Sequence, residues 1–218
     1  KDDLETLKEY LESLEYTTDL FDVGLHFNFH EASVRGKEFD LRTIFDNTIL
    51  MSDSMQAVSF VDNHDSQKGS ALESQIESWF KPHAYAIILL AERGYPCLFY
   101  GDYYGVGGQE SEHRWIIDQL LHVRKNYAYG AEIDYFDNPN IIGIYRTGRE
   151  NELNTGCVAI LSNNEDGEKL IEVGQNRTGQ VWKEVTGSGF ENVVIDDNGF
   201  AAFKVRAGKI SVWIPDEQ

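Results

Sequence analysis

The chain has 218 residues, of which 41% are hydrophobic and 26% are charged, a mixture typical of a globular protein with one large domain or two modest ones. Acidic residues outnumber lysine and arginine by 37 to 19 without a basic stripe, so the surface would repel nucleic acid and anionic lipid. The longest apolar run, 84–91, is too short to span a bilayer, and the chain opens on Lys1 and Asp2 rather than on a signal peptide. We therefore expect neither a nucleic-acid partner nor a membrane-bound one.

The two cysteines give a weak indication of compartment. Cys97 and Cys157 lie far apart in apolar contexts, with no spacing suited to zinc, and we interpret both as small buried residues. Unpaired thiols favour the reducing cytoplasm, but a secreted mature protein is the alternative. The localisation is therefore left open.

Hydrophobic periodicity divides the first 127 residues into alternating helices and strands. The predicted elements are a helix over 4–14, a strand over 20–25, a helix over 39–50, a strand over 57–61, a helix over 78–93, a strand over 97–100 and a helix over 115–127. Ser78 is a plausible N-cap for the long helix, and Gly94 with Pro96 forms its stop signal. Successive strands separated by whole helices indicate parallel β-α units.

After Gly130 the pattern changes to short apolar runs that alternate with Asn, Asp and Gly turns, which is typical of an all-β domain. The runs lie at 141–145, 157–161, 181–182, 201–205 and 210–214. No low-complexity linker separates the two halves. We therefore expect two domains, 1–127 and 128–218, that pack closely.

Each predicted strand of the first half runs into a polar cluster, and these clusters lie at 25–31, 62–67 and 101–105. In a parallel α/β barrel such positions line the catalytic face, although solvated loops have the same composition. The second cluster is the most informative, because two carboxylates, an amide and an imidazole are costly to pack without partners. In an extended segment Asn63 and Asp65 would face one side. Asp62 and His64 would face the other. A structural histidine and an N-capping aspartate remain alternatives on local sequence alone.

At these residues the sequence resembles the α-amylase family, glycoside hydrolase family thirteen. The run Phe-Val-Asp-Asn-His-Asp-x-Gln over 60–67 is similar to the family's segment at the end of the seventh barrel strand. Further matching motifs lie at 21–33, 79–86, 94–102 and 127–137, in the order and spacing of the bacterial liquefying type. The resemblance covers nearly the whole chain. It implies strands six to eight of a TIM-type (β/α)8 barrel over 1–127 and an antiparallel β-sandwich over 128–218.

The resemblance also implies a function, the retaining endo-hydrolysis of α-1,4-glucosidic bonds in starch and maltooligosaccharides. Asp65 matches the carboxylate that stabilises the transition state, and His64 matches a histidine that donates a hydrogen bond to the same sugar. His26, within the first matching motif, is expected to bind substrate.

The family's other two catalytic groups are not found in this chain. The nucleophile follows an arginine by two residues, and none of the nine arginines here has Asp at that offset. The family's general acid would lie upstream of Lys1. We expect the chain alone to be inactive on starch and its parent to be the hydrolase.

The resemblance carries expectations about metal and partners as well. Calcium is expected in the full-length parent, but no metal ligand is assigned here. Relatives can hold an additional ion near 37–39, Asn140 and Asn163, where a lysine and amides replace better ligands. The partner is an α-glucan. Three of eight barrel strands expose a sheet edge and an apolar face, so we expect the fragment to self-associate or to pair with the missing barrel half.

Three alternatives stay open at this point. The first is a related α-glucan hydrolase or transferase of the same family. The second is a non-catalytic glucan-binding module that uses Trp182 or Trp213, although their strand positions favour core packing. The third is a metal hydrolase whose ligand types, without a recognised spacing, are His26, His30, His64 and Asp62.

Overall fold

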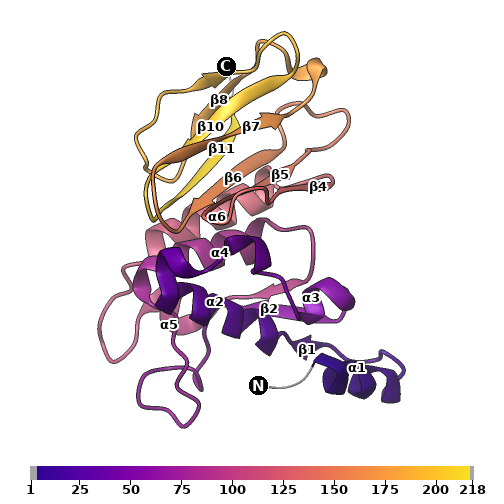
Figure 1. Ribbon diagram of the computed structural model, residues 1–218, viewed down its shortest axis with the longest axis vertical. Helices are drawn as coiled ribbons and strands as arrows, with labels where there is room; N and C mark the ends of the chain where they lie inside the picture. The colour runs from indigo at the N-terminus through magenta and orange to yellow at the C-terminus, as the bar shows by residue number, and fades with distance from the viewer. Residues whose placement is uncertain (1–3, 217–218) are drawn as a thin grey trace.

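The first half of the chain forms a small parallel sheet with helices around it (Figure 1). The structure is a computed structural model that describes residues 4–216. Strands β1 (Leu20–Phe21), β2 (Ala57–Phe60) and β3 (Tyr95–Cys97) pair in the order β1-β2-β3, and both pairings are parallel, as the alternation of strands and helices predicted. The helices of this half are α1 (Leu4–Ser13), α2 (Val23–Arg35), α3 (Ile49–Ser52), α4 (Lys81–Leu90), α5 (Tyr100–Tyr104) and α6 (Arg114–Asn126).

Strand β1 is only two residues long because Asp22 begins a helix directly after it. The Asp22 carboxylate accepts hydrogen bonds from Leu25 N at 3.1 Å and from Leu50 N at 2.8 Å, which makes it the N-cap of α2 and ties that helix to α3. Burial raises the pKa of Asp22. The prediction of a strand over 20–25 is therefore wrong beyond Phe21. The polar cluster 25–31 lies on a helix rather than in a loop after a strand.

Other element boundaries also differ from the predictions. The stretch 39–50 contains a 3-10 turn (Leu41–Thr43) before α3, and not one helix. A 3-10 turn (Ser78–Phe80) leads into α4, where Ser78 makes no cap and its hydroxyl donates to Glu112 instead. The strand expected over 97–100 ends at Cys97.

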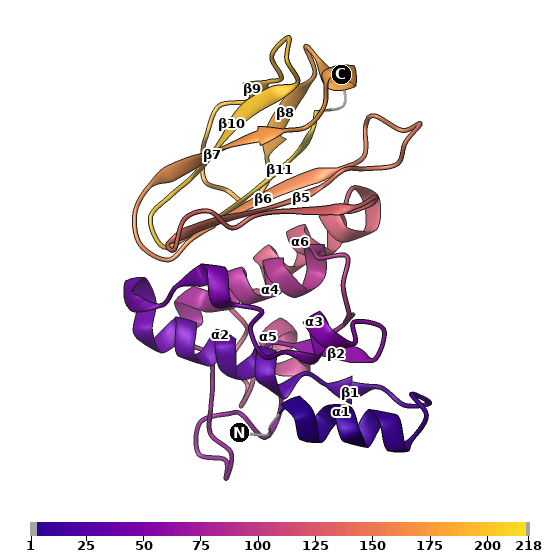
Figure 2. The same ribbon diagram turned by 45° about the vertical axis from the view of Figure 1, so that its right-hand side comes forward.

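The second half is a β-sandwich, seen edge-on in Figure 2. Its strands are β4 (Glu132–Tyr135), β5 (Ile141–Arg146), β6 (Cys157–Ser162), β7 (Gly167–Glu172), β8 (Val181–Glu184), β9 (Val193–Val194), β10 (Phe200–Val205) and β11 (Ile210–Pro215). Six of them form a sheet in the order β4-β5-β6-β11-β8-β9, and β10 pairs with β7 in the other sheet. Trp182 and Trp213 are both 0% exposed and meet the edge of Phe203 between the sheets. The expectation that these tryptophans pack in the core is confirmed.

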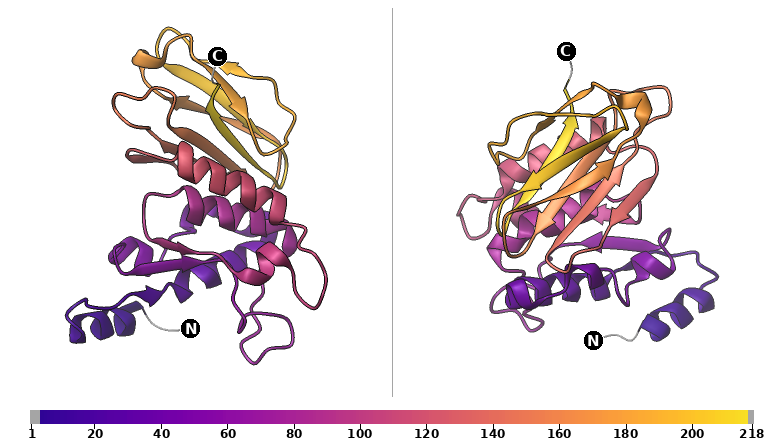
Figure 3. Two further views of the ribbon diagram at one scale, coloured as in Figure 1. Left: turned by 180° about the vertical axis from the view of Figure 1, so that it is seen from behind. Right: turned by 45° about the horizontal axis from the view of Figure 1, so that its top comes forward.

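Helix α4 joins the two halves and lies between the parallel sheet and the six-stranded sheet (Figure 3). It is buried on every side over 83–90, as a helix covered from two directions should be. Its last carbonyls are satisfied by arginines from its neighbours. Arg124 donates to Leu89 O at 2.6 Å and Arg146 donates to Leu90 O at 2.9 Å. Within residues 4–216, this helix and all the others lack the length and apolarity needed to cross a membrane.

His83 makes the junction of the two halves sensitive to pH. Its Nε2 donates to Ser162 O at 2.9 Å, from α4 to β6, and burial lowers the pKa of the ring to about 4 from 6.5. The unfolded chain binds a proton below pH 6.5 that the folded chain binds only near pH 4. Stability is therefore fully present above pH 6.5 and falls as the pH drops toward 4, by up to about 1.4 kcal/mol per pH unit.

Replacing His83 with glutamine, which keeps a donor toward Ser162 O, is expected to remove this part of the pH dependence. Urea unfolding of both proteins at pH 7 and pH 5 measures it. The original chain should lose more stability than the variant over this interval. Equal losses would contradict the assignment.

Candidate functional site

The segment that follows β2 is a tight turn over 62–66. Asn63 Oδ1 accepts hydrogen bonds from Asp65 N at 2.8 Å and from Ser66 N at 3.0 Å, which is an Asx turn. The segment is therefore not extended, and the expected alternation of its side chains is wrong. Asp62 is 2% exposed, while His64 points into solvent.

A buried ionic network holds this turn from below. Asp62 Oδ1 accepts a hydrogen bond from Ser66 Oγ at 2.8 Å, and Asp62 Oδ2 lies 2.9 Å from Lys81 Nζ in an ion pair without hydrogen-bond geometry. The same ammonium group donates to Asp102, which also accepts from Tyr85 Oη at 2.7 Å. Burial alone would lower the pKa of Lys81, but the carboxylates of Asp102 and Asp62 outweigh it, so the pKa lies above its usual value. Lys81 is therefore charged at neutral pH.

Asp65 and His64 stand at the tip of the turn and are open to solvent. Their side chains are 58% and 86% exposed, and His64 Nε2 lies 3.4 Å from Asp65 Oδ1. The Asx turn and the Asp62 network fix the backbone beneath them. The turn therefore presents a carboxylate and an imidazole side by side on a rigid support, as a site for a polar ligand requires.

Asp65 borders a cleft of about 510 Å³ at the carboxyl end of β2. The cleft is lined by aromatic rings and a few polar groups, among them Phe21, Phe60, His26, Asn63 and Ser74. Mostly apolar walls with a small number of polar groups are typical of sites for small organic ligands. His64 lies outside this lining, on the rim.

His26 forms part of the wall of the cleft, and both of its ring nitrogens have partners. Nδ1 donates to Val61 O at 2.6 Å, so Nε2 accepts from Ser74 Oγ at 2.9 Å. The ring stacks on Phe60 with centroids 5.0 Å apart and is 3% exposed. Burial lowers its pKa, which keeps the ring neutral at pH 7. A sugar hydroxyl would have to displace Ser74 to reach Nε2.

Sequence reasoning missed the residues that support the turn. The sequence predicts a helix and a matching motif around Lys81 and Tyr85 and a polar cluster around Asp102, but no contact between them. A signal was nevertheless present, because Lys81 begins an apolar helix and a lysine is rarely buried without an acidic partner. The acidic partners themselves come from two distant segments, so only the fold brings them together.

The metal-hydrolase alternative is not supported by the geometry. Within the described range 4–216, no three His, Cys, Asp or Glu side chains come together in a way that could hold a metal ion. Its four proposed ligands are engaged elsewhere or apart: Asp62 pairs with Lys81, His26 bonds to Val61 O, His30 bonds to Gln75 O, and His64 is exposed on the rim.

The contact of residues 36–39 with Asn140 and Asn163 does not fit a calcium ion. Asn140 Nδ2 donates to Lys37 O at 2.9 Å, and Asn163 Nδ2 donates to Gly36 O at 2.9 Å and to Phe39 O at 2.8 Å. Calcium needs oxygen ligands, preferably carboxylates, whereas here amide protons bond to the carbonyls. These hydrogen bonds tie the segment 36–39, directly after α2, to the β-sandwich.

Comparison with known proteins gives close relatives. The chain is 44% identical over 215 residues to the glucan 1,4-alpha-maltohexaosidase of Bacillus sp. (strain 707), with 98% of this chain and 42% of the relative covered. It is 40% identical to the alpha-amylase of Bacillus licheniformis (98% and 43% covered) and 40% identical to the cytoplasmic alpha-amylase of Escherichia coli (strain K12; 99% and 45% covered). The chain therefore spans about two fifths of the length of these relatives. No protein-family model matches it.

Solved structures agree on the fold. The alpha-amylase of Geobacillus thermoleovorans, complexed with acarbose, superposes with a TM-score of 0.63 at 14% identity, over 89% of this chain and 47% of that one. The gamma-CGTase of Alkalophilic bacillus clarkii gives 0.56 at 19% identity, over 85% and 30%. Given the identities to the bacterial relatives and the sequence motifs in their expected order, this chain belongs to the α-amylase family of glycoside hydrolases and matches the C-terminal part of its bacterial members.

Proposed function

We propose that this chain is the C-terminal portion of an α-amylase that hydrolyses internal α-1,4-glucosidic bonds with retention. In this proposal β1, β2 and β3 are strands six to eight of a (β/α)8 barrel over 1–127, and 128–218 is the C-terminal domain. The observation that carries the proposal is the position of Asp65, an exposed carboxylate on a rigid turn at the carboxyl end of β2, bordering a cleft.

The proposed chemistry divides the work between this chain and the rest of the protein. Retention needs a carboxylate nucleophile and a carboxylic acid about 5–5.5 Å apart, and both would come from residues outside this chain. Asp65 would accept hydrogen bonds from hydroxyls of the sugar at the scissile bond and stabilise the positive charge that develops on its ring. His64, beside it on the rim, would donate to the same sugar. His26 and Phe60 would shape the wall against which that sugar rests.

We also propose that the exposed face of the parallel sheet is an interface. Phe21 and Tyr95, which both pair with Val58, are 55% and 72% exposed there, and among residues 4–216 β1 and β3 are unpaired on their outer edges. The missing barrel strands would cover this face in the complete protein, and a second copy would cover it when the chain is alone. Sedimentation of the purified chain is expected to give a dimer or larger species. A monodisperse monomer would argue against the interface.

Three further points belong to the proposal. Any calcium of the complete protein is proposed to bind outside this chain. Metal analysis of the complete protein and of the 218-residue chain, each after dialysis, would test this. The relative named a cytoplasmic alpha-amylase supports a cytoplasmic location, which cell fractionation would test. A related α-glucan hydrolase or transferase is the alternative activity. The products formed by the complete protein from amylose and pullulan distinguish these specificities.

A further inference from the structure

Ser66 follows Asp65 directly in the chain, and its hydroxyl and both backbone groups form hydrogen bonds. The residue is 3% exposed. Its Oγ donates to Asp62 Oδ1 at 2.8 Å and accepts from Asn63 N at 3.0 Å. Its N donates to Asn63 Oδ1 at 3.0 Å, and its O accepts from Ser74 N at 3.0 Å. Ser66 therefore ties the turn to Asp62 at its start and to Ser74 beyond its end.

The Ser66 hydroxyl connects the turn to the buried ion pairs. Asp62 Oδ1 accepts from Ser66 Oγ at 2.8 Å and from Ile76 N at a longer 3.4 Å. Asp62 Oδ2 lies 2.9 Å from Lys81 Nζ, which Asp102 holds from another side. The Asp62 carboxylate therefore cannot follow a movement of the turn without separating buried charges. A hydrogen bond to such a carboxylate is charge-assisted and roughly twice as strong as a neutral one.

The Asp65 carboxylate has little support of its own. Its side chain is 58% exposed, and the neighbouring His64 side chain is 86% exposed. The backbone of Asp65 is held instead. Asp65 N donates to Asn63 Oδ1 at 2.8 Å, and Asp65 O accepts from the Ser70 hydroxyl. The direction of the carboxylate is therefore set by the backbone of the turn, which the Ser66 hydroxyl anchors.

Ser66 also links Asp65 to the wall of the cleft that His26 forms. Ser66 O accepts from Ser74 N, and Ser74 Oγ donates to His26 Nε2 at 2.9 Å. One residue thus bonds both to the turn that carries Asp65 and to the segment that contacts His26. Misplacement of a catalytic group by about 1 Å can cost on the order of 10²-fold in rate.

We propose that Ser66 is a positioning residue for Asp65. Its hydroxyl transmits the fixed position of Asp62, and through Asp62 that of Lys81, to the backbone that carries the Asp65 carboxylate. This role rests on the proposed function, in which that carboxylate stabilises the transition state. Because Ser66 Oγ is already bonded to Asp62 and Asn63, it acts through Asp65 and not on the sugar.

Initial rates of maltoheptaose cleavage by the complete protein test this role. Ser66→Ala is expected to lower kcat at least about tenfold, with less than about a threefold change in KM. Ser66→Thr keeps the hydroxyl and should stay within about twofold of the original kcat. Ser66→Cys, which has nearly the same shape but only a weak donor, should lie between these two variants.

A second substitution distinguishes positioning from a general loss of stability. If Ser66 acts through Asp65, adding Ser66→Ala to Asp65→Asn should change kcat by less than about twofold, because the carboxylate to be positioned is already gone. Independent structural damage would lower kcat by the same factor in both backgrounds. Hydrogen exchange at Asp65 N in the 218-residue chain is a readout without turnover, and it should be at least about tenfold faster in Ser66→Ala.

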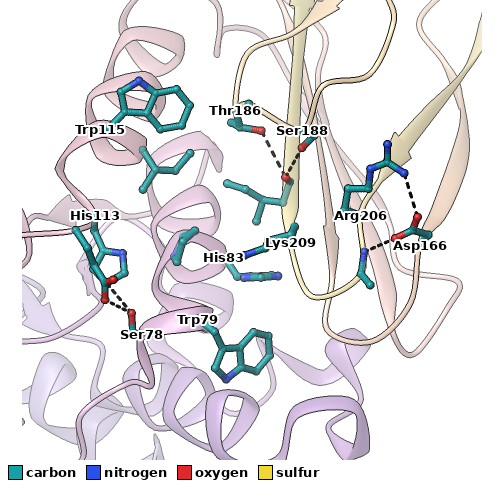
Figure 4. A pocket seen from close by; sticks show the side chains of 16 residues that line it. Ser78, Trp79, His83, His113, Trp115, Asp166, Thr186, Ser188, Arg206 and Lys209 are labelled. Carbon is teal, nitrogen blue, oxygen red and sulfur yellow. Dashed lines mark hydrogen bonds and ion pairs between the residues drawn. The ribbon is translucent and has the colours of Figure 1, made fainter.

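Ser162→Ala is the matched control. Ser162 is 0% exposed, and its hydroxyl also has two partners, donating to Glu165 O at 2.7 Å and accepting from Asn164 N at 3.3 Å. Ser162 does not line the cleft of Asp65. Alanine keeps the carbonyl of this residue, which accepts from His83 where the helices meet the β-sandwich (Figure 4). We expect the control variant to keep the original kcat and the original exchange rate at Asp65 N.

Three kinetic results would overturn the role of Ser66 and leave the proposed function standing: undiminished kcat in Ser66→Ala, equal losses in both Asp65 backgrounds, or Ser66→Thr as slow as Ser66→Ala. Unchanged exchange at Asp65 N in Ser66→Ala would overturn it too. If Ser66→Ala does not fold, Ser66→Cys takes its place in each comparison, and a cysteine variant with the original kcat would overturn the role. A complete protein that cleaves no maltoheptaose would instead reject the proposed function, and this role with it.

Discussion

Replacing Asp65 with asparagine is expected to lower kcat of the complete hydrolase about 10²- to 10³-fold, with a smaller change in KM. The physical reason is that the carboxylate would act on charge that develops only in the transition state. An amide retains the shape and one acceptor but not the negative charge. Initial rates of maltoheptaose cleavage at saturating and subsaturating concentrations measure both constants.

In this test a loss of turnover can be separated from a loss of folding, because Asp65 contributes little to the stability of the fold. Its side chain is 58% exposed and its Oδ1 lies 3.4 Å from Nε2 of the exposed His64, while the turn is held by Asn63 Oδ1. We expect the free energy of unfolding to change by less than about 0.5 kcal/mol. Asp197→Asn, the same change at an exposed turn of the β-sandwich, is the control and should keep full turnover. An Asp65 variant with undiminished kcat would remove Asp65 from the mechanism.

Replacing Lys81 with methionine is expected to destabilise the chain by about 3–5 kcal/mol at neutral pH. Methionine fills the space of the lysine stem but leaves two carboxylates, Asp62 and Asp102, buried without a counter-ion. A loss of this size is a large fraction of the stability of an ordinary domain. Urea unfolding at pH 7 measures it.

Two controls separate the network from a general effect of losing a lysine. Lys125→Met makes the same change at an exposed position of α6 and should alter stability by less than about 0.5 kcal/mol. Adding Asp62→Asn and Asp102→Asn to the Lys81 variant should recover part of the loss, since amides need no cation. A loss below about 1 kcal/mol for Lys81→Met alone would mean that the ion pairs behave like surface pairs.

Elements with strong local signals were predicted well from the sequence. The helix expected over 115–127 is observed as Arg114–Asn126, and the run 157–161 is observed as β6 over Cys157–Ser162. Strand β7 (Gly167–Glu172) was not predicted. Its charged and apolar residues do not alternate, because Glu168 and Lys169 are followed by Leu170 and Ile171, although their burial does: Lys169 is buried while Leu170 is 63% exposed.

The other failures have a common cause, which is that tertiary contacts decided the local conformation. Asp22 ends β1 because its carboxylate reaches Leu50 N, 28 residues away in the chain. In the candidate site, the family motif over 60–67 predicted Asp65 and His64 as site residues. The structure places their side chains side by side. The supporting network could not be predicted, because Lys81 meets Asp62 and Asp102 only after the parallel sheet has formed.

The central claim is that this chain carries one part of a catalytic apparatus and that the nucleophile and acid lie elsewhere in a longer protein. The most direct test follows maltoheptaose by NMR of the anomeric protons, with the purified 218-residue chain and with the longer protein in parallel. We predict no cleavage by the chain alone and release of the α-anomer first by the longer protein. Cleavage by the chain alone, or initial release of the β-anomer by the longer protein, would contradict the account.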